Sequence, residues 1–246
     1  MRVPANELIV NRKGPVTQLQ MSREGKRNSL SPALVHALHG AVQACAQDGT
    51  RLMVLEGVGR HFCAGFDLSE LEDETDDTLL ARFVRIELML QAVALAPFST
   101  CSIARGATIG AGADLFTACD VRLATADAFF SFPGAGFGIV LGTARLAQRI
   151  GESQAQRLVS SGVRVNATEA KALGLVTQIV DDSIGTCHVS DSSQYVARLP
   201  DSTHRAVLTA ARTYDAQQAR RDLAALVHSA AVPGLKERIQ RYAGKR

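Results

Sequence analysis

Hydrophobic and polar residues alternate with two different periods along the chain, and these periods follow each other in turn. The segment Val16–Met21 alternates apolar and polar residues with period two, which is typical of a half-buried strand. Hydrophobic residues then recur at helical spacing from the favoured helix start Ser31-Pro32 as far as Gly49. The apolar run 51–56 follows as a short buried strand. The first quarter of the chain is therefore predicted to form a strand, a helix and a second strand.

The same alternation of strand and helix patterns returns downstream, and it favours an α/β architecture. The polar stretch 183–195, rich in Ser and Asp, is interpreted as a linker. Beyond it, hydrophobic residues fall on helical stripes, so we expect a core over residues 1–190 and a C-terminal helical segment over 191–246. The other strands are predicted at 8–10, 101–104, 120–124 and 176–180, and the other helices at 111–118, 143–150 and 168–173.

The composition is that of an ordinary globular chain, and it narrows the classes of partner. Of 246 residues, 46% are hydrophobic and 21% charged, and the net charge of +3 comes without a long basic run, so nucleic acid is not an expected partner. The sequence has no run of ~18 apolar residues, so we expect no membrane association and a cytoplasmic location. The five scattered cysteines indicate free thiols, and no metal is expected.

Two glycine-containing segments follow predicted strands and lead towards predicted helices. One covers 60–68, after the strand at 51–56, and the other covers 105–115, after the strand at 101–104. Small residues at such junctions let backbone N–H groups point unpaired into a cleft, and two of them aimed at one oxygen form an oxyanion hole worth ~2.7–4 kcal/mol per donor. Close packing of a helix on a strand also requires small residues, and for either segment alone this is the simpler interpretation.

Taken together, the two segments resemble a known superfamily. Phe-x-Ala-Gly-x-Asp-Leu at 62–68 and Gly-x-x-x-Gly-Ala-Gly-x-Asp-Leu at 106–115 resemble motifs of the crotonase (enoyl-CoA hydratase/isomerase) superfamily. The resemblance covers nearly the whole chain in the same order. It continues through Arg27–Leu30, Ala118–Asp120, Gly142–Leu146 and Ala167–Val176.

This resemblance implies an α/β fold, a crotonase-like spiral of ββα units followed by a C-terminal helical oligomerisation segment. It implies a homotrimer or a dimer of trimers. The apolar stripes of the last fifty residues are too short to build their own core, so they are expected to pack on neighbouring subunits. The implied ligand is an acyl-CoA thioester, and no cofactor is expected apart from the CoA that belongs to the substrate.

The resemblance also assigns candidate site residues. The backbone N–H groups of Phe66 and Ala111 would hold the thioester oxygen, and Asp114 would act as the acid or base. The alternative for Asp114 is a carboxylate in the first turn of a helix, which stabilises the helix dipole by ~0.3–1 kcal/mol. CoA contacts are expected from Arg27, Ala64, Phe66, Asp67 and Arg241.

Two of these contacts also have a simpler interpretation. Asp67 is favoured as a first-turn carboxylate, and with the acidic residues that follow, up to Asp77, it is expected to form a solvated face or a loop. Arg241 matches a basic residue of the terminal helix that, in the family, reaches the nucleotide of a neighbouring subunit. The same arginine also lies in a basic run that suits a solvated face.

The sequence departs from the hydratases at both acid positions. It has Asp114 where they have Glu, and Gly134 where a second Glu follows a proline. Syn addition of water needs two groups for proton transfer, so proficient hydration is not expected. The sequence therefore predicts an enoyl-CoA hydratase/isomerase type of enzyme with a single carboxylate. A crotonase-fold decarboxylase or C–C hydrolase and a non-catalytic acyl-CoA-binding or assembly subunit are the alternatives.

Overall fold

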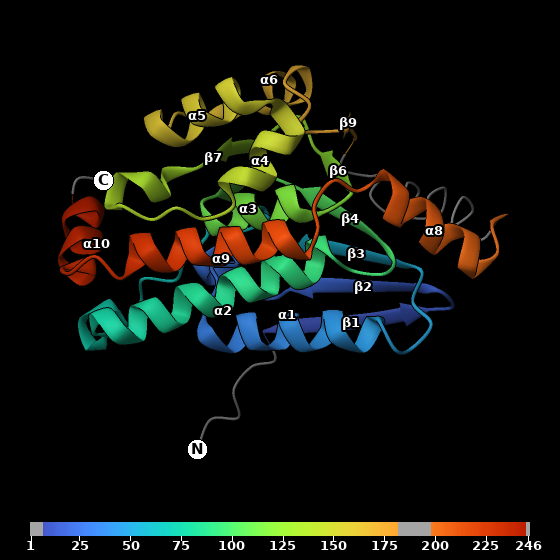
Figure 1. Ribbon diagram of the computed structural model, residues 1–246, viewed down its shortest axis with the longest axis horizontal. Helices are drawn as coiled ribbons and strands as arrows, with labels where there is room; N and C mark the ends of the chain where they lie inside the picture. Colours follow the sequence, from blue (N-terminus) through green and yellow to red (C-terminus); the bar gives the residue numbers. More distant parts are fainter. Residues whose placement is uncertain (1–6, 182–197, 245–246) are drawn as a thin grey trace.

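Two sheets organise the fold, as Figure 1 shows. The computed structural model describes residues 7–181 and 198–244. The larger sheet has the strand order β1-β2-β3-β4-β6-β9, with β1 antiparallel to β2 and the other neighbours parallel, and the smaller sheet has the order β5-β7-β8. The strands are β1 Leu8–Lys13, β2 Val16–Met21, β3 Leu52–Gly57, β4 Ser99–Ala104, β5 Ala107–Ile109, β6 Val121–Ala124, β7 Phe129–Ser131, β8 Val165–Asn166 and β9 Gln178–Ile179.

Helices cover one face of the larger sheet and extend beyond its ends. In Figure 1, α1, α2 and α9 lie in front of the sheet, and α8 and α10 lie at opposite ends of the molecule. The helices are α1 Pro32–Cys45, α2 Asp76–Ala94, α3 Ala111–Ala118, α4 Thr143–Ile150, α5 Glu152–Ser161, α6 Ala167–Ala172, α8 Asp201–Ala211, α9 Ala216–Ala230 and α10 Leu235–Ala243, with 3-10 turns η1 Glu24–Lys26, η2 Leu71–Asp73 and η3 Pro133–Phe137.

Successive units repeat the order strand, strand, helix. Strand β4 belongs to the larger sheet, β5 to the smaller one, and α3 follows; β6, β7 and α4 repeat this order, with η3 inserted before the helix. Parallel pairing of β4 with β6 and of β5 with β7 places each unit beside the preceding one. The predicted α/β spiral of ββα units is therefore confirmed.

Most elements that the pattern predicts are present. Helix α1 begins after Ser31, whose Oγ accepts a hydrogen bond from the Leu34 N–H at 3.0 Å, as an N-cap does. Helices α3 and α4 have the predicted bounds. The strand predicted at 176–180 is reduced to the two residues of β9. The predicted linker and the domain boundary after residue 190 lie outside the described residues.

The acidic stretch forms the predicted solvated face only in part: Glu70, Glu72, Asp73 and Asp77 are exposed, whereas other carboxylates of the stretch have partners within the chain. It contains η2 and leads through a capping box into α2, a helix of 19 residues. Glu74 pairs with the buried Arg82 at 2.7 Å. Asp76 accepts hydrogen bonds from the N–H groups of Gly234 and Lys236, each at 2.8 Å. Asp76 thus joins segments that are far apart in the sequence, and a run of like charges does not reveal such a partner.

Helices α9 and α10 bury part of their apolar stripes against their own chain. Leu226 of α9 and Leu235 and Ile239 of α10 form one cluster with Phe83 of α2 and with Ile139. These residues are covered without a neighbouring subunit, because α2 and the segment after η3 provide the complementary surface. Val207 and Val227 stay 53% and 36% exposed, so packing of the stripes on other subunits stays a prediction. Assembly as a trimer or a dimer of trimers stays a prediction.

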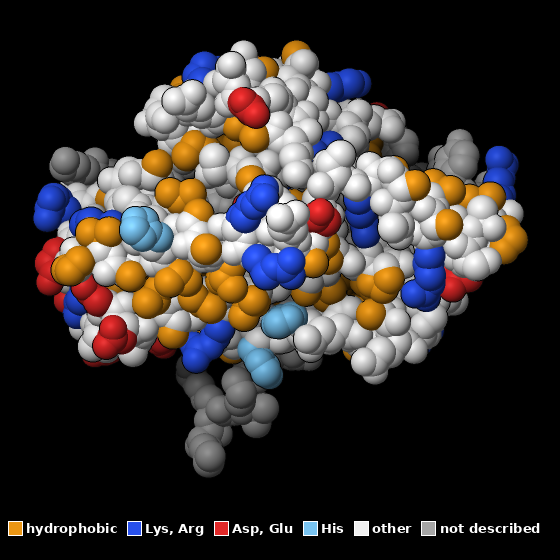
Figure 2. Space-filling view, viewed as in Figure 1, with side chains coloured by type: hydrophobic (Ala, Val, Ile, Leu, Met, Phe, Trp, Pro, Cys, Tyr) orange, Lys and Arg blue, Asp and Glu red, His pale blue; other side chains and the backbone are white. Residues whose placement is uncertain are grey.

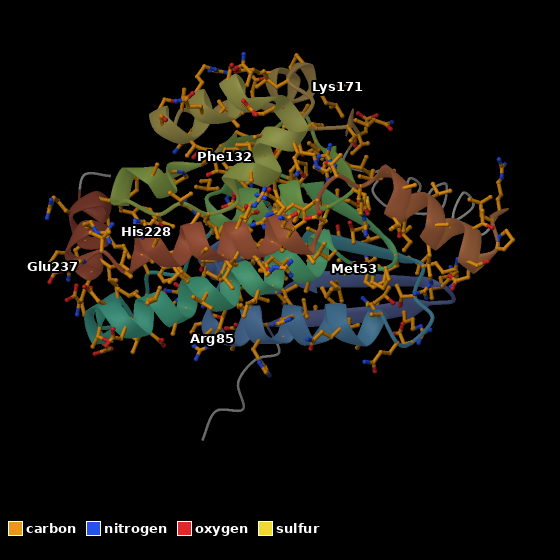
Figure 3. All side chains as sticks on the ribbon, viewed as in Figure 1. Met53, Arg85, Phe132, Lys171, His228 and Glu237 are labelled. Carbon is orange, nitrogen blue, oxygen red and sulfur yellow. The ribbon has the colours of Figure 1, made fainter. Side chains whose placement is uncertain are left out.

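Labelled side chains show which parts of the molecule are buried and which are exposed. In Figure 3, Met53 and Phe132 lie inside the molecule, whereas Glu237 points outward. Hydrophobic side chains nevertheless gather over α2 and α9 in Figure 2. On these two helices Leu88 and Val227 are 38% and 36% exposed. An exposed apolar face of this kind is one that another subunit could cover.

A buried ion pair joins α2, α4 and α9. Arg145 of α4, which is 3% exposed, donates hydrogen bonds to the two carboxylate oxygens of Glu87 at 2.8 and 2.5 Å. Tyr214 Oη and Asp222 Oδ2 contact the same guanidinium at 2.6 and 3.4 Å. Both charged groups are buried and have lost their hydration, so each is stabilised mainly by the opposite charge of the other.

We expect Arg145→Met to lower the free energy of unfolding by about 3–5 kcal/mol, because it leaves the Glu87 carboxylate buried without its partner. Urea denaturation followed by circular dichroism measures this loss. The double variant Glu87→Leu/Arg145→Met should recover most of it. As a control, Arg157→Met removes the exposed 3.2 Å pair with Glu169 and should cost less than about 1 kcal/mol. Equal losses in the two single variants would contradict this account.

Candidate active site

Backbone hydrogen bonds hold the segment after β3 against β5. The Cys63 N–H donates to Ala107 O at 3.1 Å, and the Ile109 N–H donates to Cys63 O at 2.9 Å. These bonds form an isolated parallel bridge between the two segments. Because β5 leads directly into α3, the bridge brings the motifs at 62–68 and 106–115 together.

A glycine with positive φ precedes each candidate oxyanion donor. Gly65 has φ 87° and Gly110 has φ 54°, a region that favours glycine because it lacks a Cβ atom. Space is also restricted at Gly65, since a Cβ there would lie 2.5 Å from Ile109 O and 3.3 Å from Ala111 N. The backbone before Phe66 can therefore approach the start of α3 closely.

The N–H groups of Phe66 and Ala111 have no hydrogen-bond acceptor in the part of the chain that the structure describes. Ala111 is the first residue of α3, and an N–H in the first turn has no partner within the helix. Both residues line the same cavity. Two unpaired donors on one cavity meet a basic requirement of an oxyanion hole.

The side chain of Phe66 contacts two residues of α2. The Arg82 guanidinium lies 4.2 Å from the centre of the Phe66 ring, and the Phe83 ring stacks on it at 4.5 Å between centroids. Arg82 also donates a hydrogen bond to Asp67 O at 2.9 Å, so it holds both the ring and the next peptide group. These two residues lie outside the matched motifs. Helical spacing of hydrophobic residues between 79 and 93 was the signal that could have located them.

Asp67 does not occupy the first turn of a helix, so the favoured interpretation of this residue is wrong. Its side chain is buried, pairs with Arg23 Nη2 at 2.7 Å and accepts a hydrogen bond from the Ser69 N–H at 3.0 Å. Burial opposes ionisation, but the hydrogen bonds from Ser69 and the charge of Arg23 outweigh it and lower the pKa of Asp67. Asp67 therefore stabilises the loop as a paired carboxylate.

The other predicted CoA contacts lie at different distances from the cavity. Ala64 lines it, and the Ala64 N–H donates to Arg27 O at 2.9 Å. The Arg27 residue is exposed beside this loop. Arg241 is exposed in the last turn of α10 and is not among the cavity-lining residues. Arg27 and Ala64 therefore lie next to each other in the structure. That Arg27, Ala64 and Arg241 contact CoA stays a prediction.

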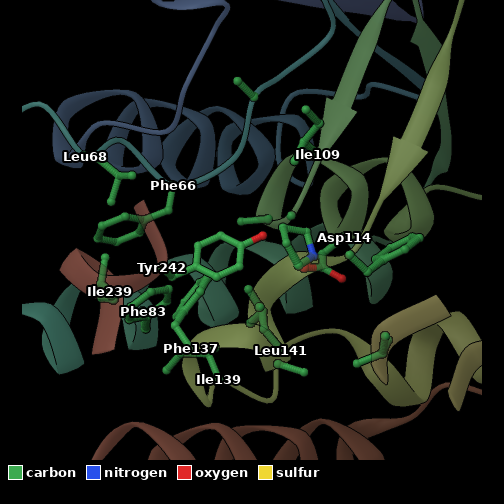
Figure 4. A pocket seen from close by; sticks show the side chains of 18 residues that line it. Phe66, Leu68, Phe83, Ile109, Asp114, Phe137, Ile139, Leu141, Ile239 and Tyr242 are labelled. Atoms are coloured by element: carbon green, nitrogen blue, oxygen red, sulfur yellow. The ribbon is translucent and has the colours of Figure 1, made fainter. Parts of the chain in front are cut away.

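Asp114 places a carboxyl group on the cavity, as Figure 4 shows. It lies in the first turn of α3 and is only 5% exposed. Burial raises the pKa of Asp114 well above its usual range; the Arg145 guanidinium opposes this shift and the Glu87 carboxylate adds to it. Desolvation is therefore the largest cause of the raised pKa of Asp114.

The cavity is apolar around this carboxyl group. Gly134 lines it where the hydratases have their second acid, so that segment contributes no carboxylate. Close contact with Gly142 positions Asp114, because a Cβ at Gly142 would overlap Asp114 Oδ1. The matched motifs do not include most of the wall. Its hydrophobic lining includes Phe66, Phe83, Phe132, Phe137, Ile139 and Ile239.

The fold and the cavity define a protein of the crotonase type. A family model described as enoyl-CoA hydratase/isomerase matches residues 11–246. The chain therefore belongs to the enoyl-CoA hydratase/isomerase family, and the resemblance seen in its motifs is confirmed. Membership of this family supports an acyl-CoA-processing enzyme.

Individual relatives agree with this assignment. A 2,3-dehydroadipyl-CoA hydratase of Escherichia coli (strain K12) is 32% identical over 183 residues, 71% of this chain and 69% of that protein. A protein of Bacillus subtilis (strain 168) named "Probable enoyl-CoA hydratase" is 33% identical over 157 residues, 61% of this chain and 60% of that protein. A crystal structure from Bordetella parapertussis, provisionally described as an enoyl-CoA hydratase/isomerase, is 37% identical with a TM-score of 0.95, covering 98% of this chain and all of that one.

The described helices include none with both the length and the apolar character needed to cross a membrane.

We expect Gly142→Ala to destabilise the protein more than Gly162→Ala. Both glycines are left-handed, with φ and ψ of 67° and -3° at Gly142 and of 61° and 15° at Gly162, so both variants carry a similar backbone cost of about 1 kcal/mol. A Cβ at Gly162 would lie 3.8 Å from Pro133 Cα, an ordinary contact, whereas one at Gly142 must displace the Asp114 carboxyl, which adds about 1–3 kcal/mol. Urea denaturation measures both losses. Equal values would contradict the close contact of Asp114 with Gly142.

We expect Asp114→Asn to be more stable than the wild type near neutral pH. Because the pKa of Asp114 is raised, the folded state keeps a proton that the unfolded state releases near pH 3.9, so wild-type stability falls as pH rises from there to the raised pKa. Thermal unfolding between about pH 4 and pH 8 measures the difference. Asp67→Asn should behave oppositely, since the pKa of Asp67 is lowered. Parallel stability curves for Asp114→Asn and the wild type would contradict this expectation.

Proposed function

We propose that the protein is an enoyl-CoA hydratase/isomerase type of enzyme that forms the enolate of an acyl-CoA thioester. Phe66 and Ala111 supply the two oxyanion donors, and Asp114 is the single carboxyl group that transfers a proton. The observation that carries this proposal is that two unpaired N–H groups and a buried carboxyl line one apolar cavity. A cavity volume of about 100 Å³ suits a small acyl group, with the CoA portion outside.

The oxyanion donors act on the thioester oxygen. When an enolate forms, negative charge develops on this oxygen, and two fixed N–H donors stabilise that charge without having to reorient. The apolar wall strengthens the effect, because an electrostatic interaction grows as the local dielectric constant falls. By precedent, the loss of one such donor costs about 10²–10³ in rate.

Asp114 then moves one proton to or from the α-carbon of the acyl group. Its raised pKa favours the protonated carboxyl, which donates to the enolate carbon; the ionised form removes the proton in the reverse direction. Water addition needs a second group for proton transfer, and Gly134 supplies none. We therefore expect hydration to be slower than in a two-carboxylate enzyme by about 10²–10⁴.

The raised pKa of Asp114 favours a second candidate, which is decarboxylation or another C–C cleavage in the same cavity. In decarboxylation the electron pair of the breaking C–C bond passes into the thioester and CO₂ leaves. The proton of Asp114 then goes to the α-carbon of the resulting enolate. This sequence requires an oxyanion hole and one acid, and it does not require a second carboxylate.

The test is exchange of the α-protons of butyryl-CoA into deuterated water, followed by mass spectrometry. We expect exchange with the wild type and a loss of at least about 10²-fold in Ala111→Pro, which removes the N–H. Proline is favoured at the first position of a helix, so α3 can keep its start. Ala111→Ser keeps the N–H and is the matched control. Asp114→Asn should also lose exchange while binding the thioester.

Each further outcome identifies a different function. Release of CO₂ from malonyl-CoA would favour the decarboxylase. Thioester binding without exchange or CO₂ release would favour the non-catalytic acyl-CoA-binding alternative. Full exchange by an Ala111→Pro variant with unchanged circular dichroism would refute the oxyanion assignment. Crotonyl-CoA hydration as fast as in two-carboxylate hydratases would refute the single-carboxyl mechanism.

A further inference from the structure

We propose that Val159 of α5 limits the length of the acyl chain that the cavity accepts, because it closes the cavity against a second, apolar hollow. The protein would therefore select short acyl groups such as butyryl. This inference rests on the proposed function of the cavity as an acyl-CoA site. It concerns a residue outside every motif that identified the family.

A groove between α4, α5 and α9 lies beside the cavity. In Figure 1, α4 lies between the other two helices. The groove has a volume of about 430 Å³, compared with about 100 Å³ for the cavity. Val159 lines both spaces. Aliphatic side chains dominate the groove, and they include Val140, Ala144, Ala147, Ala155 and Ala225.

The segment that follows η3 forms the wall between the cavity and the groove. Ile139 and Leu141 line the cavity. Val140 and Gly142, which alternate with them, line the groove, as side chains on the two sides of an extended chain do. The Val140 N–H donates a hydrogen bond to Ser229 Oγ of α9 at 3.0 Å, which holds the segment in place. A single layer of chain therefore separates the two spaces.

Asp114 touches this wall from the cavity side. A Cβ at Gly142 would overlap Asp114 Oδ1, so the carboxyl lies against the Gly142 backbone. The proposed proton transfer requires the α-carbon of the acyl group within reach of this carboxyl, and the α-carbon therefore lies near the wall. In a cavity of about 100 Å³, only a short chain fits beyond the α-carbon before it meets the wall.

The side chain of Val159 is a stiff part of the barrier. Its neighbour Leu158 is fully buried, and Ala155, one turn earlier on the same face of α5, is 1% exposed. Val159 itself is partly buried and packs, like Leu141, against the main core cluster. A β-branched residue in a helix has one strongly preferred side-chain rotamer, so Val159 cannot easily turn aside to admit a longer chain.

Another part of the cavity wall consists of packed aromatic rings. The Tyr242 ring of α10 lies on η3, where a Cβ at Gly136 would be 2.8 Å from Tyr242 Cε2. The Phe137 ring packs against it at 5.4 Å between centroids, and Figure 4 shows both rings beside the cavity. Rings from two elements close this side, so the single layer of chain beside Val159 is the thinner barrier.

The experiment compares butyryl-CoA with hexanoyl-CoA, whose acyl chain is two methylenes longer. Each methylene that leaves water contributes about 0.8 kcal/mol, which corresponds to about fourfold in affinity. Isothermal titration calorimetry should show the wild type binding hexanoyl-CoA no more tightly than butyryl-CoA, because the added methylenes meet Val159. Val159→Ala opens the barrier, so it should bind hexanoyl-CoA about ten- to twentyfold more tightly than butyryl-CoA.

Val140→Ala is the matched control. It makes the same substitution on the groove side of the wall, where Val140 is 43% exposed, and it leaves Val159 in place. Its ratio of the two affinities should equal that of the wild type. Circular dichroism and urea denaturation show whether both variants fold.

A fluorescent reporter locates the end of the chain. The sequence contains no tryptophan, so Ala225→Trp, at an exposed position of the groove, introduces a single indole. In Val159→Ala/Ala225→Trp, octanoyl-CoA should shift the emission to shorter wavelength, because the chain end displaces water from the indole. Butyryl-CoA should not shift it, and Ala225→Trp with Val159 intact should respond to neither thioester.

Three results would overturn the role of Val159 and leave the proposed function standing. They are a gain for hexanoyl-CoA in the wild type, no such gain in a folded Val159→Ala variant, and unchanged emission in the double variant. No binding of any of these thioesters by the wild type would overturn the proposed function and this inference with it.

Discussion

The pair of backbone hydrogen bonds between Cys63 and β5 is the constraint on which the candidate site depends. It joins the glycine-containing segment at 60–68 to the one at 105–115. As a result, the start of α3 and the peptide group of Phe66 face the same cavity. Gly112 strengthens the junction, because a Cβ there would lie 2.5 Å from Cys63 O. Parallel pairing of β3 with β4 places the ends of both strands at one edge, where these segments begin.

Charge balance around Asp114 follows from the same arrangement. Arg145 is the nearest cation that acts on this carboxyl, but its guanidinium is already engaged by Glu87. The loss of water around Asp114 is the largest influence on its pKa and raises it, while Arg145 opposes this shift and Glu87 adds to it. A neutral acid can therefore coexist with a buried ion pair a short way along the neighbouring helix.

The local patterns and the order of elements could be predicted from the sequence, because period-two and helical stripes depend on neighbours in the chain. Helices α3 and α4 were predicted with their observed bounds. Helix α2 was not predicted, although its apolar residues recur at helical spacing; the acidic run that leads into it was interpreted as a solvated face or a loop, and the distant partners of Asp76 are not visible in the sequence. The motifs located Phe66, Ala111 and Asp114 on one cavity. They could not locate Tyr242, because its approach to η3 depends on how α10 folds back.

The cavity combines backbone N–H groups with polar side chains, and substitutions in the course of evolution affect these two kinds of group differently. The two N–H donors belong to the backbone, so most substitutions at position 111 leave the donor atom in place, and proline is the exception. The polar side chains of the wall stand on separate elements, α3 and α10. A gene duplicate could therefore change the wall of the cavity by substitutions in the C-terminal helix alone, while it inherits the proposed oxyanion donors unchanged from the ancestral core.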